Sequence, residues 1–482
     1  MKARCLQRML IGLGLTMVLA TPWASAADRY VAPNGTGGGT SWTDTHSNLI
    51  EMVALAGDND TVYVTNNAKY YLTNQIVVKY AITVRSWGPG GILDPTNTIL
   101  DGNYPITTNR HFTLSNYWAT LAGFTLSNGW GSANTNGLGN TGASGGAISI
   151  YYGTVTNCII TRNSVFSADP SYSQAGGGGI FMGMDNAKSG GVWNCTISGN
   201  SVGPKNCGGG IMVNNGSWRI VNCTISGNTA PSAGGYEGGG IYANPASGGL
   251  LVISNCWVVS NSAGYAGGIR TAFTECHNSF IMGNTVTVKA GGIRVNNNSV
   301  IRNCLISQNS AATGGGISGN NSHSIQSCTI VSNVSSSDTG GGFDFSGSAG
   351  FPVIENTIIW GNRSGGSGIY SNWYVWRTNP STTWVTFTNC CTAPDIYSNN
   401  PGPSVYGVLA SGVNTVTNDP RYVSATDFRL QLDSPCIDAG VNRYWMEGAL
   451  DLYGYRRIDI FRKTVDIGAY EYLSKGTMFS GH

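Results

Sequence analysis

The amino-acid sequence predicts an all-β protein, a single right-handed parallel β-helix (a solenoid) with N- and C-terminal caps. Three observations support this fold class. A unit of two or three Gly, an aliphatic residue and, about a dozen residues later, Asn-Cys-x-Ile-x-x-Asn recurs at steps of 24 to 32 residues. Apolar residues within the unit alternate with polar ones, as in a strand. No stretch has the apolar spacing of an amphipathic helix, so helical repeats are excluded.

Each copy of the unit opens with an apolar residue after its Gly run. These residues are Ile148, Ile180, Ile211, Ile241, Ile269, Ile293, Ile317, Phe343 and Ile369. The second half of the unit opens with Asn157, Asn194, Asn222, Asn255, Asn278, Asn303, Asn356 and Asn389, and in the first seven cases another Asn follows six positions later. Gly and Asn adopt left-handed backbone conformations easily, so we expect them at corners between short strands. Like strands of successive turns then pair in parallel, and the preference of parallel crossovers favours the right-handed form.

The chain divides into five parts. Residues 1–26 have a basic start, an apolar run too short to span a membrane, and Ala24-Ser25-Ala26, which is the pattern of a secretory signal peptide. We expect residues 27–128 to form an N-terminal cap and the first coils, 129–390 the regular coils, 391–472 a C-terminal capping region, and 473–482 a tail. No later segment is apolar enough to span a bilayer. The protein is therefore expected to be exported and either secreted or associated with the cell surface, with the periplasm as an alternative.

The composition agrees with a packed solenoid. Gly supplies 69 residues, 41% of the chain is hydrophobic in a regular register, and only 10% is charged. The net charge of +2 implies neither nucleic acid nor an anionic membrane as a partner. The expected form is a monomer.

The cysteines fall into two groups. Six of them share one repeat position and predict an internal ladder of buried, reduced thiols: Cys158, Cys195, Cys223, Cys256, Cys304 and Cys328, with Cys390 at the last turn. A metal site needs ligands that converge on one point, so no metal is expected on this ladder. The candidates for disulfides lie off the ladder and are Cys207, Cys276, Cys391 and Cys436.

Acidic residues are dense in the C-terminal capping region, close in sequence to several Arg. Ion pairs that close the cap are the simpler interpretation. The alternative is a Ca²⁺ site, the one cofactor that the sequence suggests, built from Asp433, Asp438, Asp451 or Asp466.

Five segments together resemble bacterial right-handed parallel β-helix proteins with a choice-of-anchor Q region: YVAPNGTGGGTSW, AGDNDTVYV, GFTLSNG, SPCIDAG and DIGAYEY. The Gly-Gly-Ala-Ile of residues 145–148 also resembles, more weakly, the repeats of chlamydial polymorphic outer membrane proteins. The ten residues after Tyr472 match neither a sorting signal nor an autotransporter barrel, so an anchoring role is not expected. The resemblance implies the fold and export, and it implies no particular reaction.

The sequence shows no evident catalytic constellation. Carboxylates between residues 145 and 372 are few: Asp169, Asp185, Glu237, Glu275, Asp338, Asp344 and Glu355. A paired acid and base for glycoside hydrolysis is therefore not expected. A polysaccharide lyase needs less, a cation that neutralises a uronate and a base that takes the adjacent proton, and it stays as the alternative function.

Two outward columns of side chains suggest a carbohydrate-binding surface. The residue after each opening aliphatic should point outward, and this column contains Tyr242, Arg270, Arg294 and Asp344, with Asn244 and Asn296 two positions further on. An Arg pair beside a Tyr and amides offers bidentate donors and a stacking surface to an acidic sugar chain. A second column places Trp257 and Phe280 outward on successive turns, where an apolar row either lies under a loop or binds a ligand. The prediction is an exported, non-catalytic β-helix whose partner is extracellular polysaccharide or a cell-surface glycan.

Overall fold

The computed structural model describes residues 26–131, 144–166, 175–183, 189–204, 206–231, 237–245, 248–337, 339–347, 352–365, 372–377, 385–393 and 410–472. The predictions of a signal peptide and a tail concern residues outside these ranges. Among the described residues, no helix is long and apolar enough to cross a membrane.

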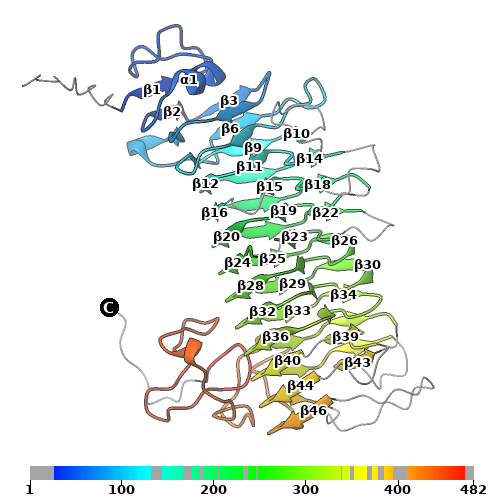
Figure 1. Ribbon diagram of the computed structural model, residues 1–482. Helices are drawn as coiled ribbons and strands as arrows, with labels where there is room; N and C mark the ends of the chain where they lie inside the picture. Colours follow the sequence, from blue (N-terminus) through cyan, green and yellow to red (C-terminus); the bar gives the residue numbers. More distant parts are fainter. Residues whose placement is uncertain are drawn as a thin grey trace, which may run out of the picture.

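Nearly all regular structure consists of short strands, which stack turn upon turn into four parallel sheets along the length of the molecule (Figure 1). In the described part of the chain, sheet A contains β1 (Asp28–Val31), β2 (Thr61–Thr65), β5 (Thr83–Trp87), β8 (Thr120–Ala122), β12 (Gly153–Thr156), β16 (Ser189–Trp193), β20 (Ser217–Val221), β24 (Leu251–Ser254), β28 (Thr274–His277), β32 (Ser299–Arg302), β36 (His323–Gln326), β40 (Val353–Glu355), β44 (Val385–Thr388) and β46 (Ala410–Val413). Sheet B contains β3 (Ala68–Tyr71), β6 (Thr98–Asp101), β9 (Thr125–Ser127), β13 (Ile159–Thr161), β17 (Thr196–Ser198), β21 (Thr224–Ser226), β25 (Trp257–Val259), β29 (Phe280–Met282), β33 (Leu305–Ser307), β37 (Thr329–Val331), β41 (Ile358–Trp360) and β45 (Cys391–Thr392).

The other two sheets complete each turn. Sheet C contains β4 (Ile76–Val78), β7 (Phe112–Leu114), β11 (Ile148–Ile150), β15 (Ile180–Met182), β19 (Ile211–Asn214), β23 (Ile241–Asn244), β27 (Ile269–Thr271), β31 (Ile293–Val295), β35 (Ile317–Gly319), β39 (Phe343–Gly347) and β43 (Trp373–Arg377). Sheet D contains β10 (Trp130–Gly131), β14 (Ser164–Val165), β18 (Ser201–Val202), β22 (Thr229–Ala230), β26 (Ser262–Tyr265), β30 (Thr285–Lys289), β34 (Ser310–Ala311), β38 (Val334–Ser335) and β42 (Arg363–Ser364). A regular turn passes through sheets C, A, B and D in that order. The predicted right-handed parallel β-helix is confirmed.

The first Asn of each repeat lies at the corner between sheets A and B. Its φ is between 47° and 53° in every turn, and Ser327 takes the same conformation in the turn that lacks this Asn. Asn tolerates this left-handed region better than most residues, so the repeat places its corners as the sequence predicts.

The second Asn of each repeat forms a buried ladder. The main-chain N–H of each one donates to the side-chain Oδ1 of the Asn on the next turn, at 2.9–3.1 Å. Its Nδ2 donates to the same oxygen and to a main-chain carbonyl of the preceding turn. The ladder consists of Asn163, Asn200, Asn228, Asn261, Asn284, Asn309, Asn333, Asn362 and Asn372.

The predicted thiol ladder is confirmed as part of the interior. Cys158, Cys195, Cys223, Cys256, Cys304, Cys328 and Cys390 are free thiols that are at most 2% exposed, and Ser279 and Thr357 fill the same position in two turns. These residues line one side of a single apolar core that runs through the coils.

The sequence assigns the last repeat incorrectly. The opening residue Ile369 lies outside the described residues, and Phe343 pairs with Trp373 instead. Asn372 accepts a hydrogen bond from the N–H of Asn362 at 3.1 Å and so extends the Asn ladder. The residue that follows it, Trp373, therefore enters the core and contacts Phe387 at 5.5 Å between ring centroids.

The N-terminal end carries a helix, α1 (Leu49–Leu55), next to β1 (Figure 1). The side chain of Asn48 caps it by accepting a hydrogen bond from the N–H of Glu51. Leu49, Met52 and Val53 are buried against the first coils, so the helix covers the apolar end of the solenoid. Two short 3₁₀ helices, Pro89–Gly91 and Tyr444–Met446, occur elsewhere.

The C-terminal region, defined here as residues 415–472, does not cover the opposite end of the solenoid. It lies along the flank of the later coils, against sheet B and its corner with sheet A (Figure 1). Side chains of corner residues bind its main chain, with Asn303 donating to Leu450 O, Asn356 to Val441 O and Asn389 to Ala439 O, each at 2.8 Å. The reason lies in sheet B, whose outward row contains the apolar residues Leu305 and Ile358, and the C-terminal region covers both.

Candidate functional site

Arg270 and Arg294 occupy equivalent positions on β27 and β31, as the repeat register predicts. Both side chains lie on the outer face of sheet C. The next outward positions of this column are Ser318 and then Asp344, so Asp344 is two turns away from Arg294.

A carboxylate already bridges the two guanidinium groups. Glu237 accepts a hydrogen bond from Arg270 Nε at 3.2 Å and also pairs with Arg294 Nη1. Arg270 Nη1 further donates to Ala243 O at 2.8 Å and to Asn244 Oδ1 at 3.0 Å. The expectation of two unpaired cations that await an acidic ligand is therefore wrong, because Glu237 reaches them from a loop 33 and 57 residues earlier in the chain.

The aromatic faces beside this pair are also occupied. The Arg270 guanidinium lies 4.8 Å from the centre of the Tyr242 ring, and that of Arg294 lies 5.6 Å from the Tyr265 ring. Tyr242 is half-buried and packs on Phe181 and Met212. Burial raises the pKa of its hydroxyl, although Arg270 opposes this shift. A phenol of raised pKa is a poor general base at neutral pH.

The remaining predicted residues of sheet C are closed to a ligand. Asp344 is 2% exposed and pairs with Lys289 at 3.5 Å. Asn296 is buried, and its N–H donates to Thr271 O. Only Asn244 of this group is exposed, and its side chain is bound to Arg270. The structure thus unites Tyr242, Asn244, Arg270 and Arg294 around Glu237, as a set of mutually satisfied groups.

The second predicted column behaves differently. Trp257 and Phe280 pair on adjacent strands, and their rings stack with centroids 4.1 Å apart and an interplanar angle of 14°. Trp257 is 47% exposed. On its other side the neighbouring position is Thr224, which has a short side chain, and from the 47% exposure of Trp257 we infer that this second face of the ring is open.

Hydroxyl side chains lie on the strands of sheet B next to this open face. Thr196 and Thr224 precede Trp257 in the outward column of sheet B, and Ser198 and Ser226 lie beside them. All four are partly exposed. A sugar ring that stacks on an indole needs such donors and acceptors for its own hydroxyl groups.

The C-terminal region lies on the other side of the stacked Trp257 and Phe280 rings. Leu305, the next outward residue after Phe280, is 4% exposed because it packs with Phe428, Ala469 and Tyr470. Phe280 lies at the edge of this cluster. The apolar row is thus covered from Leu305 onward, and Trp257 remains open where the cover ends.

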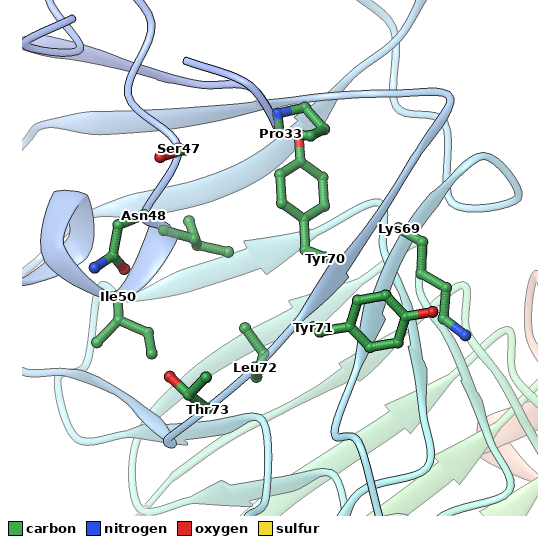
Figure 2. A pocket seen from close by; sticks show the side chains of 10 residues that line it. Pro33, Ser47, Asn48, Ile50, Lys69, Tyr70, Tyr71, Leu72 and Thr73 are labelled. Carbon is green, nitrogen blue, oxygen red and sulfur yellow. The ribbon is translucent and has the colours of Figure 1, made fainter. Parts of the chain in front are cut away.

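A cavity of about 410 Å³ at the N-terminal end is a feature that the sequence did not suggest. It lies between the start of α1 and β3, and its lining includes Pro33, Asn48, Lys69 and Tyr71 (Figure 2). Lys69 is paired with Asp101 at 2.7 Å and lies 4.9 Å from the Tyr71 ring. The residues come from a loop and a strand without a repeat pattern, so no sequence signal links them.

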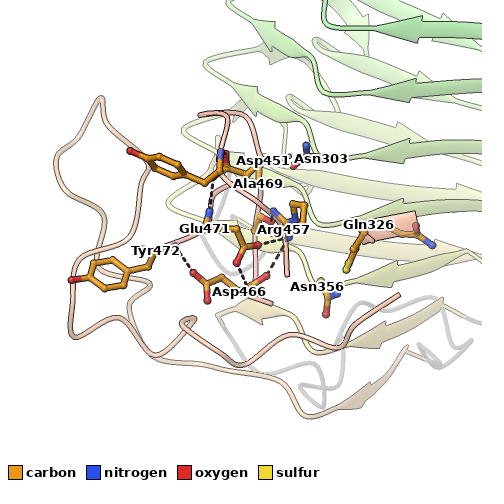
Figure 3. A network of polar contacts seen from close by, with 12 residues as sticks. Asn303, Gln326, Asn356, Asp451, Arg457, Asp466, Ala469, Glu471 and Tyr472 are labelled. Atoms are coloured by element: carbon orange, nitrogen blue, oxygen red, sulfur yellow. Dashed lines mark hydrogen bonds and ion pairs between the residues drawn. The ribbon is translucent and has the colours of Figure 1, made fainter. Parts of the chain in front are cut away.

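The acidic residues of the C-terminal region do not assemble into a cation site. Asp451 accepts hydrogen bonds from the N–H groups of residues 453, 455 and 471, and Asp466 from those of residues 438 and 472 (Figure 3). Asp438 binds Arg462 and Asp433 binds Arg421. Within the described residues, no three His, Cys, Asp or Glu side chains are grouped so that they could hold a metal ion. Ion pairs and main-chain donors occupy the carboxylates that the Ca²⁺ alternative requires.

Comparisons with known proteins do not identify a family for this chain. No family model matches the sequence, and no curated protein is similar enough in sequence to count as a relative. Similar solved structures include pectate lyase Pel9A (13% identity, TM-score 0.42, 92% of this chain and 96% of that one), a rhamnogalacturonan lyase (13%, 0.37, 76% and 87%) and XylC in complex with xylose (10%, 0.36, 82% and 87%). Likeness at this level carries no information on a reaction or ligand. The resemblance to choice-of-anchor Q and polymorphic outer membrane proteins stays a prediction.

Proposed function

We propose that the protein is an exported, non-catalytic β-helix that binds extracellular polysaccharide or a cell-surface glycan, with Trp257 as its stacking platform. The observation that carries this proposal is the open face of an indole whose other face is held by Phe280. A ring that is already fixed loses little side-chain entropy when a sugar stacks on it. The hydroxyl-lined strip next to it supplies polar partners along the direction of a chain.

The proposal favours glycans recognised by their ring faces over glycans recognised by charge. Glu237 neutralises Arg270 and Arg294, so this pair is not required for binding. Binding through Trp257 should depend weakly on salt, whereas an open pair of cations would give strong salt dependence.

The test compares variants on a panel of neutral and acidic polysaccharides by affinity electrophoresis and by quenching of tryptophan fluorescence. Trp257→Ala should weaken binding by about three- to tenfold, which is the range of an aromatic contact. Trp118→Ala removes a 78% exposed tryptophan from the N-terminal coils and serves as the matched control. Unchanged affinity in Trp257→Ala would overturn the proposal, and a loss of acidic-glycan binding in Arg270→Gln/Arg294→Gln would restore the Arg site.

A polysaccharide lyase is the other outcome of the same experiment. Incubation with uronic-acid polysaccharides would report it through the absorbance of new unsaturated chain ends. We expect no such product, because the raised pKa of Tyr242 and the paired Arg270 leave the sheet C cluster without a free base or cation.

A further inference from the structure

Cys391 and Cys436 are brought together from two parts of the chain. Cys391 lies on β45 and points away from the core, since its neighbour Cys390 belongs to the internal ladder. It pairs with Ile358 and is fully buried on the outer side of sheet B. What buries it there is the C-terminal region.

Cys436 is the part of that region which faces Cys391. Both residues are 0% exposed and share one apolar cluster with Ile358, Leu430 and Ile467. Both thiols are free and lie in this one cluster, where Cys391 Sγ also contacts Asn418 O at 3.4 Å. The main-chain carbonyl of Cys436 accepts from the N–H of Ile467 at 2.9 Å, so its position is held by the fold of the C-terminal region itself.

The ladder cysteines also neighbour one another along the solenoid axis, as when Cys158 N donates to Cys195 Sγ at 3.3 Å. Each ladder thiol contacts the main-chain carbonyl two residues before it, at 3.1–3.4 Å, for example Cys195 with Trp193 O. Cys276 faces the core between Ile253 and Ile301. The ladder links turns that strand pairing already holds. Cys391 and Cys436 connect the solenoid to a region whose other attachments are side-chain packing, hydrogen bonds, the Arg443–Glu355 ion pair and the β-bridge between Cys391 and Val416.

We propose that Cys391 and Cys436 form a disulfide that fastens the C-terminal region to the flank of the β-helix. The proposal rests on the proposed export, because disulfides persist in oxidising compartments. The oxidant is a second disulfide, from a thiol–disulfide oxidoreductase or a small molecule such as oxidised glutathione. One thiolate attacks it to form a mixed disulfide, and the other displaces the second thiol of the oxidant. The two cysteines lose two protons and two electrons in total, and the oxidant is reduced to two thiols.

The burial of both sulfurs sets the order of events. An external oxidant reaches them before the C-terminal region docks, and docking then shields the bond from reductants. The cross-link closes a loop of about 45 residues, a length at which a disulfide removes much entropy from the unfolded chain.

The experiment refolds the full chain in oxidised and reduced glutathione, or in excess reductant, and maps the peptides after alkylation. In the oxidised sample only, we expect a Cys391–Cys436 peptide and, for the intact protein before alkylation, a mass about 2 Da lower. Thermal unfolding should shift down by several degrees on reduction of the wild type. Cys391→Ala/Cys436→Ala should show no shift on reduction, whereas the control Cys207→Ala keeps it.

Recovery of Cys391 and Cys436 as alkylated thiols after oxidative refolding, or joined to other cysteines, overturns the proposal. The refolding is independent of glycan binding and of export. A cross-link without glycan binding would refute the proposed function alone.

Discussion

Glu237 lies between two guanidinium groups that would otherwise face each other across one strand spacing. Its side chain is 12% exposed, and those of Arg270 and Arg294 are 17% and 24% exposed. Charges this far from water interact more strongly than surface pairs, and removal of the shared partner leaves two like charges in contact. Burial already lowers the pKa of Arg294, which shows how poorly solvated its charge is.

Glu237→Gln is therefore expected to lower the free energy of unfolding by about 2 kcal/mol. Glu275→Gln is the matched control, because Glu275 is 38% exposed and pairs with Arg302 alone. Glu275→Gln should lower the free energy of unfolding by less than about 1 kcal/mol. Urea denaturation followed by tryptophan fluorescence measures both, and equal losses would contradict the central role given to Glu237.

The Asn ladder is the element that ties each turn to the next. Each rung satisfies a buried main-chain N–H that lies between strands and adds a bond to a strand carbonyl, with one side chain per turn. The corner residues Asn194, Asn222 and Asn255 have a simpler role, since they supply a left-handed conformation at an exposed position.

Asn261→Ala should lower the free energy of unfolding by about 3 kcal/mol, because it leaves Asn228 N without its acceptor in the interior and removes the side-chain amide bond to Asn284. Asn255→Ala, at the corner of the same turn, should lower the free energy of unfolding by about 1 kcal/mol. The reason is that residue 255 has a φ of 53°, which Ala adopts less easily than Asn. Thermal unfolding of the two variants gives the comparison. A corner variant that is as unstable as the ladder variant would show that conformation, and not hydrogen bonding, limits the turn.

The whole molecule combines a repetitive solenoid with a C-terminal region that has no repeat. Arg457 is fully buried in that region and lies among Asp451, Asp466 and Glu471, with Glu471 Oε1 at 3.1 Å (Figure 3). Burial raises the pKa of all three carboxyls, that of Asp466 to about 6. Three carboxylates around one guanidinium make the ionised state costly in this packing.

The docked C-terminal region should accordingly become more stable as the pH falls. The pKa of Asp466 is about 6 in the folded protein and 3.8 in the reference state, so the folded form binds the proton more tightly between these values. Protection of its amides in hydrogen exchange, corrected for intrinsic rates, should increase from pH 7 to pH 5, by roughly 1–3 kcal/mol. Asp466→Asn should remove most of this dependence.

A measurement local to the C-terminal region is needed, because His111 and His323 make the stability of the coils change with pH in the opposite direction. Burial lowers the pKa of both to about 4, so the stability of the coils falls as the pH drops from 6.5 towards 4. A C-terminal region whose protection is the same at pH 5 and pH 7 would contradict the role given to Asp466.

The repeat was sufficient to predict the solenoid, its parallel pairing, the corners, the buried thiols and the neighbourhoods of Arg270–Arg294 and Trp257–Phe280. The physical reason is that position within a turn decides both the direction of a side chain and its neighbours above and below. Contacts between residues at the same repeat position can thus be predicted from their spacing in the sequence alone.

Contacts between non-repetitive segments were decided only by the tertiary structure. Glu237 was visible as one of few carboxylates, but its reach to two Arg residues depends on the path of a loop. The same holds for the C-terminal region, which packs on the flank of sheet B and not over the end, and for the last turn, where Trp373 replaces Ile369. In each case an apolar surface or a buried charge contacts the segment that the fold brings close to it in space. The spacing of residues along the chain does not predict which segment that is.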